Sequence, residues 1–162
     1  MINVYLLLGS NLGNRLMYLQ EAARYINEQT GTIINQSAFY ETQSWGNTGV
    51  PDYLNQVLLL HTALLPHDLL NKLLQIELIL GRERHEKWGS RTVDIDILFY
   101  DSEVINDPDL VVPHPQLHNR RFTLEPLAEI APNFIHPVYN KTISSLKIEL
   151  NDDLQVKKYI FE

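Results

Sequence analysis

The chain has 162 residues, of which 44% are hydrophobic, so it is long enough for one domain with a core and too short for two ordinary ones. We therefore expect a single domain over residues 1–162. The formal net charge of −7 argues against general nucleic-acid binding, which requires a basic surface. The absence of cysteine excludes disulfides and thiolate metal sites and favours a cytoplasmic location.

The chain opens with the pattern of a strand, a turn and a helix. Residues 2–8 are rich in leucine and β-branched side chains, which predicts a strand. No basic residues precede this apolar run, and the GSNLGN turn ends it far below the length that spans a membrane. We therefore expect neither a signal peptide nor a membrane partner. Residues 16–29 then place apolar side chains at helical spacing.

The middle of the chain indicates two strands, a helix and a further strand. Residues 32–42 and 53–62 are extended stretches, and the segment WGNTGVPD separates them. A second helix opens at Pro66 and ends before Gly81, and the strand TVDIDILFY follows an arginine-rich loop. The order β-α-β-β-α-β predicts an α+β, ferredoxin-like core with a mostly antiparallel sheet. The expected C-terminal additions are helices at about 122–130 and 142–149 and a last strand at about 155–161.

Two aspartates alternate with apolar side chains in the strand TVDIDILFY. Successive side chains of a strand point to opposite faces, so Asp94 and Asp96 share one face, about 7 Å apart along the strand. Two like charges at such positions repel each other unless a cation compensates them, and oxygen-only ligands suit Mg²⁺. We interpret the pair as metal ligands. The alternative is a solvent-facing edge strand that carries two surface aspartates.

Basic side chains concentrate in two short segments of this acidic chain. They are Arg82, Arg84, Lys87 and Arg91, followed further along by Arg120 and Arg121. Guanidinium groups match phosphate oxygens bidentately and stabilise the charge that builds during phosphoryl transfer. The pattern favours a concentrated site for a small anion. For the first segment alone, the alternative is a solvated loop neutralised by its own glutamates.

Several motifs of nucleotide-dependent and hydrolytic enzymes are absent. The chain lacks GxxxxGK[ST], so it is not a P-loop enzyme, and it also lacks the protein-kinase motifs, a G-x-S-x-G elbow and an H-E-x-x-H helix. The histidines form no cluster in the sequence, and we assign none of them to a metal. His114, in the loop VPHP, is a candidate donor to a phosphate or a nucleotide, and the alternative is a structural role between two prolines.

Aromatic and amide side chains offer contacts for a flat organic ring. Aromatic rings can sandwich such a ring while an amide reads its edge. Taken alone, each of these residues is more often a packing residue than a ligand contact. The candidates are Tyr53, Asn55, Trp45, Trp88 and Phe122.

Five motifs in a fixed order carry a resemblance to a known family. They are GSNLGNR, FYET followed by PDYLNQV, IELILGRER, WGSRTVDIDIL, and VPHPQLHNRRFTLEPLAEIAP, and they run over nearly the whole chain. Together they resemble the 6-hydroxymethyl-7,8-dihydropterin pyrophosphokinases of folate biosynthesis. The resemblance implies an ATP-dependent diphosphokinase that transfers pyrophosphate to the pterin hydroxymethyl group and releases AMP. It also implies two Mg²⁺ ions, small-molecule substrates and a monomer.

The same resemblance implies roles for individual residues. Asp94 and Asp96 would hold the two Mg²⁺ ions that bridge the ATP phosphates. Arg82 and Arg91 would be catalytic and would meet the phosphates during transfer. The implied nucleotide contacts are Glu77, Arg84, Lys87, Trp88, His114 and Arg120. The implied pterin contacts are Thr42, Gln43, Trp45, Tyr53, Asn55 and Phe122.

Some positions depart from the family pattern, and two other functions stay open. Gln43 and Ser44 replace a proline-rich pair, and Trp45 replaces a smaller apolar residue beside the pterin. One alternative is another Mg²⁺-nucleotide transferase, such as a nucleotide-sugar glycosyltransferase, which also uses an Asp-x-Asp pair. The other is a non-catalytic ligand-binding module, because ferredoxin-like folds often serve that way.

Overall fold

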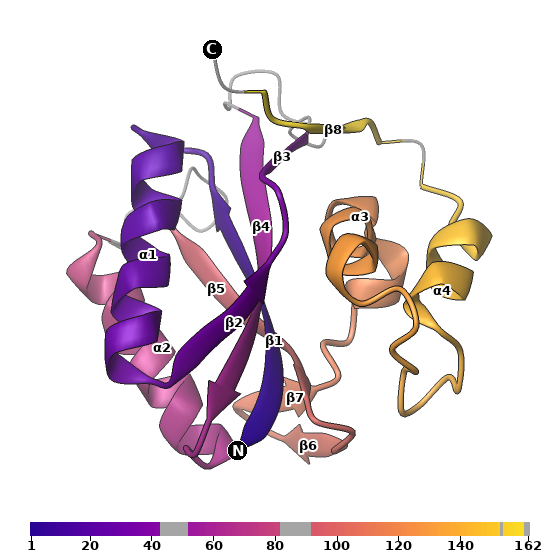
Figure 1. Ribbon diagram of the computed structural model, residues 1–162, viewed down its shortest axis with the longest axis horizontal. Helices are drawn as coiled ribbons and strands as arrows, with labels where there is room; N and C mark the ends of the chain where they lie inside the picture. Colours follow the sequence, from indigo (N-terminus) through magenta and orange to yellow (C-terminus); the bar gives the residue numbers. More distant parts are fainter. Residues whose placement is uncertain (43–51, 82–91, 153, 161–162) are drawn as a thin grey trace.

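A computed structural model describes residues 1–42, 52–81, 92–152 and 154–160. Two pairs of helices cover the two faces of one sheet (Figure 1). The helices are α1 (Arg15–Gln29), α2 (Pro66–Ile79), α3 (Arg121–Ile130) and α4 (Ile143–Glu149), with a 3₁₀ turn η1 at Leu117–Asn119. Among the described helices, none is long and apolar enough to cross a bilayer.

The sheet is antiparallel wherever its strands pair. Its strands are β1 (Ile2–Ser10), β2 (Thr32–Gln36), β3 (Tyr40–Thr42), β4 (Tyr53–Thr62), β5 (Asp94–Tyr100) and β8 (Val156–Lys158). They lie in the order β5-β1-β4-β3-β8, and β2 also pairs with β4. The succession β1-α1-β2-β4-α2-β5 confirms the predicted ferredoxin-like core.

Alternation along β1 divides the core into two layers. Val4, Leu6 and Leu8 point toward α1 and α2 and are fully buried there. Tyr5 and Leu7 point the other way, into the cluster beneath α3 and α4. Burying a leucine side chain contributes about 1.5–3 kcal/mol, so this strand stabilises both layers at once.

Local sequence explains where α1 and α2 begin. Asn14 caps α1, because its side-chain oxygen accepts a hydrogen bond from the Met17 backbone N–H at 3.1 Å. Gly13, just before the cap, adopts a left-handed conformation with φ of 67°. Pro66 stands at the start of α2, where its missing N–H and fixed φ suit the first turn.

Two features differ from the sequence-based expectation. The stretch predicted as one strand over 32–42 divides into β2 and β3, because the Ser37 hydroxyl replaces a main-chain carbonyl as the acceptor for the Val57 N–H at 2.9 Å. A small hairpin of β6 (Ile105–Asp107) and β7 (Leu110–Val112) was not predicted. The helices near 122–130 and 142–149 and a short strand inside 155–161 are confirmed as α3, α4 and β8.

Candidate functional site

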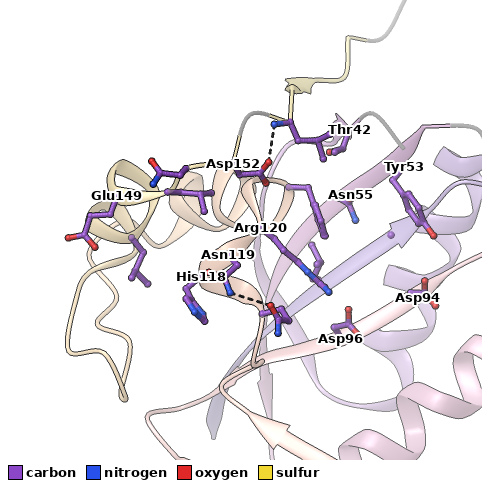
Figure 2. Close-up of a pocket in the computed structure, with 18 residues that line it drawn as sticks. Thr42, Tyr53, Asn55, Asp94, Asp96, His118, Asn119, Arg120, Glu149 and Asp152 are labelled. Carbon is purple, nitrogen blue, oxygen red and sulfur yellow. Dashed lines mark hydrogen bonds between the residues drawn. The ribbon is translucent and has the colours of Figure 1, made fainter. Parts of the chain in front are cut away.

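A pocket of about 1180 Å³ lies on the sheet face toward α3 and α4 (Figure 2). Its floor comes from alternate residues of four neighbouring strands, β5, β1, β4 and β3. Its far wall comes from η1, the start of α3, and the C-terminal segment 146–154. The floor residues are Asp94 and Asp96, Leu7 and Gly9, Tyr53 and Asn55, and Thr42.

Asp94 and Asp96 stand together on the floor at the β5 edge. Both side chains are partly buried and line the pocket, whereas Ile95 between them is buried in the opposite layer with α1 and α2. The register explains this, because Asp94 pairs with Gly9 and Asp96 with Leu7, and both partners also line the pocket. The prediction that the two carboxylates share one face is confirmed, and Figure 2 shows both on one side of β5.

Asn55 and Thr42 line the pocket and carry buried polar atoms that lack hydrogen-bond partners among the described residues. Asn55 is 4% exposed, and its Nδ2 donates to the Leu8 carbonyl at 3.2 Å. Among the residues that the structure describes, Asn55 Oδ1 and Thr42 Oγ1, on a side chain 3% exposed, have no hydrogen-bond partner. A buried polar atom left unpaired costs about 1–3 kcal/mol, which a bound ligand with matching groups would offset.

The neighbouring arginines Arg120 and Arg121 have different surroundings. Arg120 lines the pocket, with its guanidinium carbon 5.5 Å from the centre of the Phe122 ring, and Figure 2 shows it pointing toward the aspartates. Arg121 instead binds the C-terminal segment: its Nε donates to the Asp152 carbonyl at 3.1 Å, and its Nη1 lies 3.2 Å from Glu125. Arg120 therefore carries the positive charge of the described pocket wall, and Arg121 holds that wall in place.

His114 does not line the pocket, although it lies just before η1. Its backbone N–H donates to the Leu98 carbonyl at 3.0 Å, and its Nδ1 accepts from the Gln116 N–H at 3.1 Å. Burial, and secondarily the charge of Arg120, lower the pKa of His114 to about 4. The ring is therefore neutral near pH 7, and with Nδ1 acting as acceptor its proton is on Nε2.

Glu77 lies behind the aspartate strand instead of in the pocket. The side chain is 4% exposed, and its Oε2 accepts the Ile95 backbone N–H at 2.7 Å. Strand β5 is the first strand in the order of the sheet and pairs with β1 along one edge. Glu77 accepts the Ile95 N–H on the other edge. The carboxylate therefore satisfies a main-chain donor directly between Asp94 and Asp96.

Other predicted site residues lie outside the described part of the chain. The structure describes neither of the segments 43–51 and 82–91. The residues concerned are Gln43, Trp45, Arg82, Arg84, Lys87, Trp88 and Arg91. Their roles remain predictions from the family resemblance.

The C-terminal wall contains pocket residues that the sequence reasoning missed. Glu149, Asn151 and Asp152 line the pocket, as do the η1 residues His118 and Asn119. Asn119 donates from its side chain to the Gln116 side chain at 3.2 Å. No sequence motif connects residue 150 with residue 94, and tertiary packing, including that of α4 against α3, brings them to one pocket.

The carboxylate pair fits the donor set of Mg²⁺ in complex with a phosphate compound. In the described ranges, no group of three or more histidine, aspartate or glutamate side chains is placed to hold a metal ion. Magnesium commonly takes one or two protein carboxylates and completes its octahedron with water and substrate phosphates. Asp94 and Asp96, both facing a pocket large enough for such a substrate, match that requirement.

The pocket contains a carboxylate pair at one end and amide and aromatic side chains at the other. This combination indicates an enzyme that brings a phosphate donor to a flat acceptor. A model of the 7,8-dihydro-6-hydroxymethylpterin-pyrophosphokinase (HPPK) family matches residues 5–132. The chain belongs to this family.

Two relatives are similar over almost their whole length. The 2-amino-4-hydroxy-6-hydroxymethyldihydropteridine pyrophosphokinase of Aquifex aeolicus is 45% identical over 149 residues, which make up 92% of this chain and 92% of the relative. The protein of the same name from Haemophilus influenzae is 38% identical over 158 residues, which make up 97% and 98% of the two chains. Both matches extend the similarity well past residue 132.

The fold is also similar to that of a solved HPPK-DHPS chain from Plasmodium falciparum, crystallised with pteroate. The TM-score is 0.72 at 18% identity, over 91% of this chain. The chain spans 42% of that longer protein. At this identity the similarity supports the fold alone.

Proposed function

We propose that this chain transfers the pyrophosphoryl group of ATP to the hydroxymethyl group of 6-hydroxymethyl-7,8-dihydropterin. The acceptor hydroxyl gives up its proton to the surrounding water as its oxygen attacks the β-phosphorus, the bond from that phosphorus to the bridging oxygen of the α-phosphate breaks, and AMP leaves with that oxygen. The observation that carries the proposal is that a chain of the HPPK family places a carboxylate pair and a ring-sized polar pocket on one sheet face.

At the aspartate end of the pocket, we assign the triphosphate. Asp94 and Asp96 would hold Mg²⁺, expected as two ions, which when bound neutralises phosphate charge and orients the reacting groups. Arg120 adds a cation on the opposite wall that can pair with phosphate oxygens. The family resemblance adds Arg82 and Arg91 as catalytic residues and Arg84, Lys87 and Trp88 as nucleotide contacts.

Glu77 and His114 contribute to the nucleotide site from outside the pocket lining. Glu77 supports the strand that carries the aspartates through its hydrogen bond to Ile95. His114 is neutral and presents an Nε2–H donor, which suits a sugar hydroxyl or a phosphate oxygen.

At the β3 and β4 end of the pocket, we assign the pterin. Tyr53 and Phe122 present aromatic rings for stacking on a flat heterocycle. Asn55 Oδ1 and Thr42 Oγ1, which are buried and have no partner among the described residues, would gain partners from the edge of a pterin that reaches them. Gln43 and Trp45 stay predicted contacts.

The assay that tests this proposal measures AMP formation when ATP, Mg²⁺ and the hydroxymethyl dihydropterin are mixed with the protein. We expect AMP in amounts equal to the pyrophosphorylated pterin, and none when the pterin is omitted. A nucleoside diphosphate as the product, or no turnover at all, would contradict the assignment. The first result would favour a different nucleotide transferase, and the second a binding module.

We also propose a domain organisation and an oligomeric state for the protein. Residues 1–162 would act as one domain and as a monomer, because one pocket already contains residues assigned to both substrates. A cytoplasmic location stays a prediction from the absence of cysteine. Light scattering of the purified protein, with and without both substrates, would test the monomer.

A further inference from the structure

Gly9 occupies the point on the central strand where the two halves of the pocket meet. In the sheet register it stands opposite Asn55 of β4 on one side and Asp94 of β5 on the other. It also lines the pocket. A side chain at this position would rise from the floor between the atoms assigned to the pterin and those assigned to the metal.

The space above Gly9 is already filled by the Asn55 amide. A Cβ added to Gly9 would lie 2.6 Å from Asn55 Nδ2, closer than side-chain atoms pack, whereas its distances to Asn55 Cγ and Tyr53 Cδ1 would be an ordinary 3.8 Å. The conflict therefore falls on one atom. Asn55 Nδ2 also donates a hydrogen bond, at 3.2 Å, to the backbone carbonyl of Leu8. Leu8 is the residue before Gly9 in β1.

The hydrogen bond to Leu8 decides which end of the amide meets a ligand. With Nδ2 on Leu8, the Oδ1 atom is buried and has no partner in the described structure. A ligand that reaches this atom meets an acceptor, so the orientation of the amide selects for a donor on the ligand. Because Asn55 is 4% exposed and closely packed, a displaced amide must turn or move toward the pocket that the residue lines.

We propose that Gly9 is a positioning residue for substrate specificity: its missing side chain allows the Asn55 amide to lie against β1 with its oxygen toward the acceptor ring. This inference rests on the proposed function, since the ligand edge that meets Asn55 is taken to be an N–H donor of the pterin. Gly9 acts through Asn55, and the contact at 2.6 Å is its physical basis.

A double-mutant cycle tests this role, with wild type, Gly9→Ala, Asn55→Ala and the double variant compared. Dissociation constants are measured for the hydroxymethyl pterin, with Mg²⁺ and a non-hydrolysable ATP analogue present, and separately for that analogue alone. We expect Gly9→Ala to weaken pterin binding by about 10-fold or more, a loss of about 1.4 kcal/mol, with nucleotide affinity unchanged. In the Asn55→Ala background the same change should have no further effect, because the conflicting atom is gone.

Other results for the Gly9 and Asn55 variants would either overturn or support the role of Gly9. Unchanged pterin affinity in Gly9→Ala, equal losses for both substrates, or additive losses in the double variant would overturn the role of Gly9. If Gly9→Ala fails to fold, recovery of folding in the double variant supports the contact with Asn55, and failure of both variants overturns it. A wild type that binds no pterin would refute the proposed function and this inference with it.

Discussion

At the scale of single residues, adjacent positions in this chain carry separate tasks. Asp94 and Asp96 face the pocket while Ile95 fills the core between them. Arg120 faces the pocket while Arg121 fastens the C-terminal segment. The arginine pair offers a comparison in which a neighbour of the same chemistry serves as the control.

The aspartate pair gives the sharpest test at this scale. Asp94→Ala and Asp96→Ala should each lower turnover by orders of magnitude, because each removes a proposed Mg²⁺ ligand where phosphate charge must be neutralised. Steady-state AMP release at saturating Mg²⁺ measures the effect. Asp109→Ala, at an exposed aspartate beside His67 on another part of the surface, is the matched control and should keep wild-type turnover. Near-normal turnover in both β5 variants would refute the metal assignment.

The arginine pair separates binding from folding. Arg120→Ala should weaken nucleotide affinity several-fold with little loss of stability, because it removes a pocket cation. Arg121→Ala should instead lower the free energy of unfolding by about 1–3 kcal/mol, since it deletes the side-chain hydrogen bonds to the Asp152 and Leu150 carbonyls and the ion pair with Glu125. Urea unfolding and calorimetric titration distinguish the two. Lost stability in Arg120→Ala together with weakened nucleotide affinity in Arg121→Ala would contradict both assignments.

At the scale of secondary-structure elements, the buried Glu77 carboxylate of α2 accepts a backbone hydrogen bond from β5, on the edge of that strand that faces away from β1. Glu77→Ala should cost about 1–3 kcal/mol of stability, because it leaves the Ile95 N–H buried without its acceptor. It should also raise the Mg²⁺ concentration needed for half-maximal turnover, since the strand carrying both aspartates loosens. Glu77→Gln retains an acceptor oxygen and should restore most of both properties.

The control for this prediction is Gln75→Ala, at an exposed position two residues earlier on the same helix. It should change neither stability nor the Mg²⁺ requirement. If Glu77→Ala altered nucleotide affinity while the Mg²⁺ requirement and stability stayed unchanged, Glu77 would be a direct nucleotide contact instead.

Element patterns in the sequence predicted most of the fold and part of the site. The two-residue period of β5 correctly placed Asp94 and Asp96 on one face, because that pattern depends only on local backbone geometry. The break near Ser37 was not predictable, since it depends on a hydroxyl that bonds to Val57 of a distant strand. The inward role of Glu77 was missed for the same reason, because its partner is a backbone N–H supplied by tertiary packing.

At the scale of the whole molecule, two histidines, the partly buried His114 and the buried His136, make stability depend on pH. Burial lowers the pKa of His114 to about 4, with the charge of Arg120 as a second cause. The pKa of His136 is also lowered to about 4, by burial and then by His118. As pH falls below about 6.5, these histidines bind protons in the unfolded chain but stay neutral in the folded chain. Their contribution to the free energy of unfolding is therefore complete above pH 6.5 and is lost between about pH 6.5 and 4.

Urea unfolding across that pH range measures the decline. Each histidine contributes a slope of at most about 1.4 kcal/mol per pH unit. In His136→Asn the slope should be smaller, while the asparagine oxygen can still accept from the Val138 N–H as His136 Nδ1 does. A slope that stayed the same in this variant would show that other groups cause the loss.

The pocket wall formed by residues 146–154 lies beyond residue 132, where the match to the family model ends. A compound confined to the floor would meet the strand residues by which the family is recognised. One that extended past Arg120 to Glu149 and Asp152 would also meet side chains supplied by the last part of the chain. An inhibitor that spans the floor and this wall should therefore bury more of its surface against the protein than one confined to the floor.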